Sequence, residues 1–194
     1  MDNRFKLIVD SFGSSRFKFN ESLKDYTALK SEGLAKVLFI VFTSSELIKI
    51  VKMCRDLKLP FFIFGTGSKI IISNLGFDGL VIKNRTKNIK TVSVKGKVTK
   101  TGIGVEEALI EVDSGVSIGK FAEFLDSQNL SAEGFTGLPG TIGGNLFLSK
   151  FLQNMSKSIK VLDSDCEIDE ISANNLSLKR HIIISAVFKI KARS

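Results

Sequence analysis

The order of apolar runs in the first third of the chain most constrains what it can fold into. "VLFIVF" (37–42) has the composition of a buried strand, and "FFIF" (61–64) has that of a second one. Between them, Thr43 and Glu46 have the spacing of a capping box, which predicts the start of a helix, and Pro60 ends that helix. Strand, helix and strand in this order predict a βαβ unit with parallel strands and a right-handed crossover.

Two further strands are expected after this unit, at "KIII" (69–72) and "GLVI" (79–82). The predicted helix carries its apolar side chains at positions that share one face. These residues are Leu47, Ile48, Val51, Cys54 and Leu57.

The pattern changes near Ile89, where "IKTVSVKGKVTKTG" alternates as a hairpin does, with a turn expected near Lys95 and Gly96. "EALIEVDSG" continues the strands, and Ser117 caps a helix over "IGKFAEFLDSQNL". The strands "SIKVLDSDCEIDEIS" and "HIIISAVFKIK" follow. The helix is expected to bury one face, made of Ile118, Phe121, Ala122 and Leu125.

These elements predict an α+β fold with two lobes. Residues 1–86 form a small βαβ lobe, and residues 87–194 form a larger lobe with a mixed or antiparallel sheet and helices. With 194 residues, of which 43% are hydrophobic, the chain can fill one core or two small lobes that share one. No apolar run approaches the roughly 18 residues of a membrane span, and no signal peptide begins the chain. We therefore expect a soluble, cytoplasmic protein without membrane partners.

Cysteine, histidine and charge exclude several classes of function. Cys54 and Cys166 are far apart in the sequence, and the chain has one histidine, so neither a disulfide framework nor a metal site is expected. The formal charge is +8, but the lysines are spread along the chain and not clustered, whereas modules that stack bases usually place aromatic side chains beside a basic cluster. This favours a solvated surface that tolerates an anionic ligand over a nucleic-acid partner.

The first glycine-rich segment, "FGTGSK" (64–69), directly follows a predicted buried strand. A dinucleotide fingerprint needs a third glycine where Ile70 stands and a helix after it, so that interpretation fails, and there is no phosphate-binding loop of GxxxxGK[ST] type. Two interpretations are left. The segment is either an ordinary tight turn between two strands, or a turn whose exposed N–H groups and Ser68 hydroxyl hold an anion.

The second segment, "GLPGTIGG" (137–144), contains four glycines and a proline that stiffens its turn. Bare backbone of this kind can lie flat against an extended ligand, or it can pack closely on the sheet of its own lobe. Two such segments in successive lobes favour an elongated ligand bound between the lobes.

Together the two segments resemble a known family. "FGTGSKIIISNLGFDGLVIKN", followed by "VDSGVSIGKFAEFLDSQNLSAEGFTGLPGTIGG", is similar to the FAD-binding region of the UDP-N-acetylenolpyruvoylglucosamine reductases, also called UDP-N-acetylmuramate dehydrogenases. These flavoproteins have the vanillyl-alcohol-oxidase or PCMH type of FAD domain. "LKDYTALKSEGLAKVLFIVFTSSELIKIVKMC" matches the opening of that region, so the resemblance extends from about residue 23 to residue 190.

The resemblance implies which residues bind the cofactor. In the first segment, a turn that cradles the FAD pyrophosphate would comprise Gly65, Thr66, Gly67, Ser68 and Lys69. In the second, a stretch that runs along the cofactor near its flavin would comprise Thr136, Gly137, Leu138, Pro139, Gly140, Thr141, Gly143 and Gly144. The family usually has glycine where Thr66 stands and asparagine where Lys69 stands.

The resemblance also implies a reaction, in which NADPH reduces FAD and the flavin reduces a UDP-sugar precursor of peptidoglycan. In the family, a C-terminal substrate domain supplies the proton donor, whereas this sequence ends at Ser194. We therefore expect a shortened or divergent flavoprotein, or one completed by a separate chain, and no catalytic residue is assigned. Arg180 and His181 are interpreted as a surface pair. The alternative is a non-catalytic remnant that uses the fold as a binding or scaffold protein.

Overall fold

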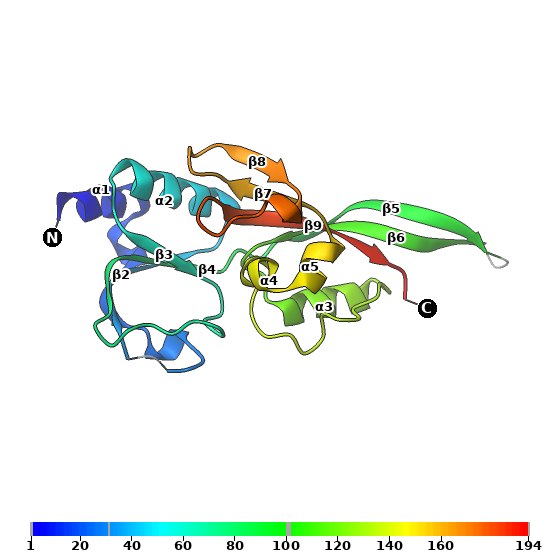
Figure 1. The fold of residues 1–194 in the computed structure, drawn as a ribbon, viewed down its shortest axis with the longest axis horizontal. Helices are drawn as coiled ribbons and strands as arrows, with labels where there is room; N and C mark the ends of the chain where they lie inside the picture. Colours follow the sequence, from blue (N-terminus) through cyan, green and yellow to red (C-terminus); the bar gives the residue numbers. More distant parts are fainter. Residues whose placement is uncertain (1, 31, 100–101, 194) are drawn as a thin grey trace. The chain divides into compact units, whose positions relative to one another are not determined.

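The computed structural model describes residues 2–30, 32–99 and 102–193, and the chain divides into two compact units, Met1–Thr86 and Lys87–Ser194 (Figure 1). Unit 1 contains a four-stranded sheet and two α-helices, and unit 2 contains a five-stranded sheet and three α-helices among the described residues. The predicted α+β class is confirmed. None of the described helices has the length and apolarity that a membrane span requires.

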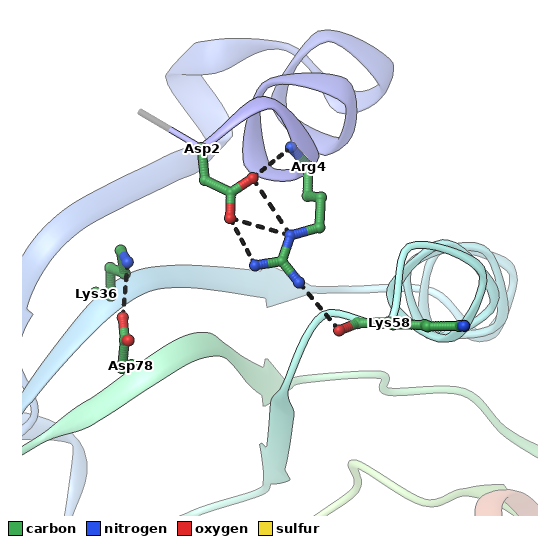
Figure 2. Close-up of polar contacts among 5 residues, drawn as sticks. All are labelled: Asp2, Arg4, Lys36, Lys58 and Asp78. Atoms are coloured by element: carbon green, nitrogen blue, oxygen red, sulfur yellow. Dashed lines mark hydrogen bonds and ion pairs between the residues drawn. The ribbon is translucent and has the colours of Figure 1, made fainter.

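Unit 1 begins with α1 (Asn3–Phe12), which the sequence patterns did not predict. Asp2 caps α1 by accepting a hydrogen bond from the N–H of Arg4 at 2.9 Å, and the Arg4 guanidinium pairs with the Asp2 carboxylate at 2.6 Å (Figure 2). This pairing lowers the pKa of Asp2 to about 2. Arg4 also donates to the carbonyl of Lys58 at 3.1 Å, which joins the start of α1 to the segment that follows the second helix, α2 (Ser44–Asp56).

The sheet of unit 1 has the strand order β1-β2-β4-β3. Its strands are β1 (Phe17–Ser22), β2 (Leu34–Val41), β3 (Phe61–Phe64) and β4 (Phe77–Asn84). Strand β1, a second unpredicted element, is antiparallel to β2, whereas β2, β4 and β3 are parallel. The predicted βαβ unit is present, with β4 lying between its two strands. Short 3-10 turns occur at Ser14–Arg16 and Lys24–Tyr26.

Helix α2 (Ser44–Asp56) starts where the capping pattern predicts, because the Thr43 hydroxyl accepts from the N–H of Glu46 at 3.2 Å. Its fully buried face differs from the prediction at two positions. Ile50 is buried where Ile48 was expected, and Leu57 lies just beyond the last turn of the helix and is only partly buried. The buried residues of the helix are Leu47, Ile50, Val51 and Cys54.

The strand predicted at 69–72 is wrong. These residues form no ladder with a neighbouring strand and belong to the loop between β3 and β4. Ile70 and Ile72 pack on a buried cluster of unit 1, and Ile71 between them is 81% exposed. The run of β-branched residues that suggests a strand therefore belongs to a loop in which Ile70 and Ile72 face the core and Ile71 faces solvent.

Unit 2 has an antiparallel sheet with the order β5-β6-β9-β7-β8. Its strands are β5 (Ile89–Thr99), β6 (Gly102–Asp113), β7 (Ser156–Leu162), β8 (Ile168–Ile171) and β9 (Ile182–Lys191), with a 3-10 turn at Ala173–Asn175. Strand β9 pairs with β6 only at Glu107–Asp113, so β5 and the start of β6 extend as a two-stranded ribbon (Figure 1).

The turn predicted near Lys95 and Gly96 is also wrong, because β5 continues to Thr99. The register between β5 and β6 shifts at Lys95–Gly96, so the glycine marks an irregularity of the strand. The connection at residues 100–101 lies outside the described residues.

One core fills unit 2. Helix α3 (Ile118–Ser127) starts at the predicted cap, where Ser117 accepts from the N–H of Lys120, and it buries the four predicted residues. Helices α4 (Ile142–Leu148) and α5 (Lys150–Met155) complete the layer on the sheet. Phe121, Phe135 and Phe188 are fully buried with ring centres 5.1 to 5.9 Å apart. These contacts fix the segment between α3 and α4 on its own sheet.

Candidate functional site

The turn at residues 65–69 follows the carboxyl end of β3 in unit 1. Gly67 has φ +73°, and a Cβ on it would overlap the carbonyl oxygen of Tyr26 and lie 3.0 Å from the Cα of Thr27. The carbonyl of Gly67 also accepts from the N–H of Ala28 at 3.1 Å. The glycine at this position is therefore required by close packing on the chain at residues 26–28.

The N–H groups of Thr66, Gly67 and Ser68 donate to no other group among the described residues. The Thr66 hydroxyl donates to the Ser68 hydroxyl at 3.2 Å, and Thr66 and Lys69 are exposed. Three neighbouring N–H groups without partners, with hydroxyls beside them, can bind an anion without a helix. The five predicted residues thus lie together in one turn with donors available.

The turn occupies the edge of the sheet where the parallel strands β2, β4 and β3 all have their carboxyl ends. Such edges are where ligands bind in open α/β sheets. Asn84, at the end of β4, is buried and accepts from the N–H of Thr86 at 3.0 Å, which fixes the chain as it leaves the strand.

Lys83 lies beside the turn and is a residue that the sequence patterns did not single out. It pairs in register with Phe64, and its ammonium donates to the carbonyl of Gly65 at 3.4 Å. Burial lowers the pKa of Lys83, with a smaller contribution from Arg85. The one signal in the sequence is a lysine inside the otherwise apolar strand "GLVIKN".

In unit 2, residues 136–140 form a loop that turns twice through left-handed backbone, with φ +82° at Gly137 and +109° at Gly140. A Cβ on Gly137 would meet nothing within 4 Å, so the backbone conformation alone calls for glycine there. Thr136, Gly137 and Pro139 are exposed, whereas Leu138 packs against the unit 2 core. This loop presents bare backbone to its surroundings.

The other predicted residues of the segment, Thr141, Gly143 and Gly144, form the start of helix α4. Thr141 is buried and caps α4, where its hydroxyl accepts from the N–H of Gly144 at 3.4 Å. Gly143 donates to the carbonyl of Ser114 at 2.9 Å, and a Cβ on it would lie 2.9 Å from the Ser114 Cβ. Gly143 and Gly144 lie within a helix that the sequence patterns did not predict, so only residues 136–140 form an extended loop.

Asn145 holds this loop against the helix. Its side chain is 1% exposed, and its amide nitrogen donates to the carbonyls of Pro139 and Thr141, each at 3.0 Å. Because the amide joins the two ends of the 139–141 stretch, Asn145 sets the position of the exposed loop.

Comparison with known sequences and structures shows which proteins this chain is similar to. Residues 35–149 match the family described as an FAD binding domain. A UDP-N-acetylenolpyruvoylglucosamine reductase of Clostridium tetani is 27% identical over 198 residues, which cover 94% of this chain and 60% of the relative. The enzyme of the same name from Lactobacillus acidophilus is 30% identical, over 87% of this chain and 57% of the relative. The chain thus spans about 60% of the length of these relatives.

Solved structures share the fold. The crystal structure of the UDP-N-acetylenolpyruvylglucosamine reductase from Thermus caldophilus has a TM-score of 0.64 and 22% identity, and the match covers 90% of this chain and 62% of that one. A p-cresol methylhydroxylase with bound substrate has the same TM-score at 12% identity, over 100% of this chain and 44% of that one. The predicted PCMH-type fold is therefore confirmed.

Proposed function

This chain belongs to the FAD-binding domain family, and we propose that it binds FAD through the turn at residues 65–69 and the loop at residues 136–140. The observation that carries the proposal is the row of three N–H groups, at Thr66, Gly67 and Ser68, that donate to nothing else among the described residues. A pyrophosphate needs several such donors, because an unpaired buried phosphate costs several kcal/mol.

The residues present fit this cofactor. Backbone N–H groups, the Ser68 hydroxyl and the nearby lysines offer donors and positive charge to the pyrophosphate. The exposed backbone at Gly137 leaves room for a flat ring system to approach closely. We propose that the two units are the two lobes of one FAD-binding domain, and that Thr141, Gly143 and Gly144 serve the cofactor indirectly by shaping the loop.

FAD supplies hydride transfer when it is bound, and the protein's part is to hold and orient it. By similarity to the reductases, we propose NADPH as the reductant, a UDP-sugar as the acceptor and the cytoplasm as the compartment.

One finding favours a second function, a non-catalytic binding or scaffold protein. Gly67 and Gly143 are both accounted for by contacts within their own units, so the fold would need them without any flavin. Such a protein would keep its glycine segments after the loss of the cofactor.

The flavin absorption spectrum of the purified protein, before and after incubation with FAD and desalting, separates these functions. A retained flavin spectrum supports FAD binding, and its bleaching by NADPH under anaerobic conditions supports the oxidoreductase. Retained flavin that NADPH does not bleach limits the proposal to cofactor binding. A colourless protein after incubation contradicts FAD binding and supports the scaffold function.

A further inference from the structure

Lys83 is a half-buried lysine that forms no ion pair within the described part of the chain. Its ammonium lies 4.8 Å from the ring centre of Phe64 and 5.2 Å from that of Tyr26, and its one hydrogen bond is to the carbonyl of Gly65. Among the described residues, no carboxylate lies within ion-pair distance of it. The charge is therefore compensated only by ring faces and one carbonyl.

Lysines on the same sheet are paired differently. Lys36 on β2 lies 2.7 Å from Asp78 on β4 (Figure 2), and Lys18 on β1 lies 2.8 Å from Glu21. Both of those lysines are more exposed than Lys83. The lysine that has lost the most water is thus the one without a carboxylate, which is an unfavourable arrangement for the folded protein alone.

The position of Lys83 suggests what compensates the charge. Its ammonium donates to the carbonyl of Gly65, the first residue of the 65–69 turn, and the next three N–H groups of that turn have no partner among residues that the structure describes. A cation and three N–H donors at one edge of a sheet are the complement of a phosphate group. Ring faces and one neutral carbonyl leave the ammonium without a negative charge, which a phosphate oxygen would supply through a charge-assisted hydrogen bond.

We propose that the Lys83 ammonium neutralises the phosphates of a ligand bound at the 65–69 turn. The phosphate then takes the place of the carboxylate partner that Lys83 lacks within the described chain. The inference rests on the proposed function in one respect, that the turn holds a phosphate-bearing ligand. It adds a residue outside both glycine segments, on strand β4 of unit 1.

The test compares three variants, Lys83→Met, Lys83→Arg and the charge-matched control Lys36→Met. Dissociation constants for FAD and for inorganic pyrophosphate are measured by calorimetry, and the unliganded proteins are unfolded in urea. For Lys83→Met we expect a roughly 10- to 100-fold weaker affinity for both ligands, with no loss of stability in the unliganded protein. Lys83→Arg should bind within about threefold of the wild type, since it keeps the charge.

The control should behave in the opposite way, with unchanged affinity and a small loss of stability from the broken pair with Asp78. Should Lys83→Met fold poorly, Lys83→Gln replaces it, as the amide keeps the hydrogen bond to Gly65 without the charge. FAD bound by Lys83→Met as tightly as by the wild type would overturn the inference and leave the proposed function standing.

The pyrophosphate measurement distinguishes failure of the proposed FAD binding from failure of the proposed role of Lys83. If wild-type protein binds no FAD but binds pyrophosphate, and Lys83→Met does not, the proposed function is wrong and the role of Lys83 stands. If neither ligand binds the wild type, both are wrong.

Discussion

Gly67 packs so closely on Tyr26 that no side chain larger than hydrogen fits between them. The left-handed φ of +73° adds a second reason for glycine at this position. The turn at residues 65–69 is thus held by the chain at residues 26–28, which fixes where its unpaired N–H groups lie.

Gly67→Ala should lower the free energy of unfolding by about 2–4 kcal/mol, from left-handed strain and overpacking combined. Urea unfolding measures this change. Gly119→Ala is the matched control, because Gly119 lies on the exposed side of α3 with nothing within 4 Å of its missing Cβ. It should be neutral or stabilising by up to about 1 kcal/mol. Equal effects at the two sites would show that the packing on Tyr26 is unimportant.

Asn145→Ala should destabilise the protein by about 1–3 kcal/mol, because it removes the buried amide that donates to the carbonyls of Pro139 and Thr141. The loop at residues 136–140 should also become more mobile, which limited proteolysis can follow. Asn154→Ala, an exposed asparagine on α5, should change neither quantity appreciably. A loop as resistant to protease in Asn145→Ala as in the wild type would contradict the role of Asn145.

The two thiols should differ in reactivity. Cys54 is fully buried, and burial raises its pKa to about 12. At pH 8 its thiol is therefore protonated and out of reach of a reagent in solution. Cys166 is only partly buried. A thiol-reactive dye should label one cysteine quickly in the native protein and both in urea, and Cys166→Ser should remove the fast phase. Two equally fast thiols in native protein would disagree with the burial of Cys54.

Glu111 should make stability depend on pH in the acidic range. Its carboxylate pairs with Lys90 at 2.8 Å and accepts from the Ser185 hydroxyl at 2.8 Å, and these contacts hold its pKa below the usual value. The folded pKa is below the unfolded one. The stabilisation is therefore present above the unfolded pKa and is lost as pH falls through the folded pKa.

Glu111→Gln should lower the free energy of unfolding by about 1 kcal/mol at pH 7, and the difference from wild type should shrink below pH about 4. Urea unfolding at the two pH values tests this. Glu133→Gln removes an exposed carboxylate and serves as the charge control. A difference that stays constant down to pH about 3 would mean that Glu111 acts by packing and not by charge.

Helices and strands whose apolar residues repeat with a clear period could be predicted from the sequence. Segments whose conformation depends on contacts with distant residues could not. Helix α3 buries its four predicted residues because its helical pattern and its cap agree. The β-branched run Ile70–Ile72 suits both a strand and a loop that packs on the core, so the sequence alone could not separate them.

The candidate site shows the same limit. The glycines of both segments were visible in the sequence, but whether each faces a neighbour or open space depends on residues far away, such as Tyr26 and Ser114. The sequence did not single out Lys83 either, because its neighbours are also distant along the chain. A lysine in a strand is unremarkable until the structure shows that no carboxylate in the described chain approaches it.

The central claim is that the N–H groups of Thr66, Gly67 and Ser68 bind the pyrophosphate of FAD. The most direct test follows their resonances in two-dimensional NMR spectra of the ¹⁵N-labelled protein during titration with FAD. We predict that all three move downfield with saturating FAD and become protected from solvent exchange, because they take phosphate oxygens as acceptors. FAD that binds while these three resonances stay where they are would contradict the account, since the cofactor would then be held elsewhere.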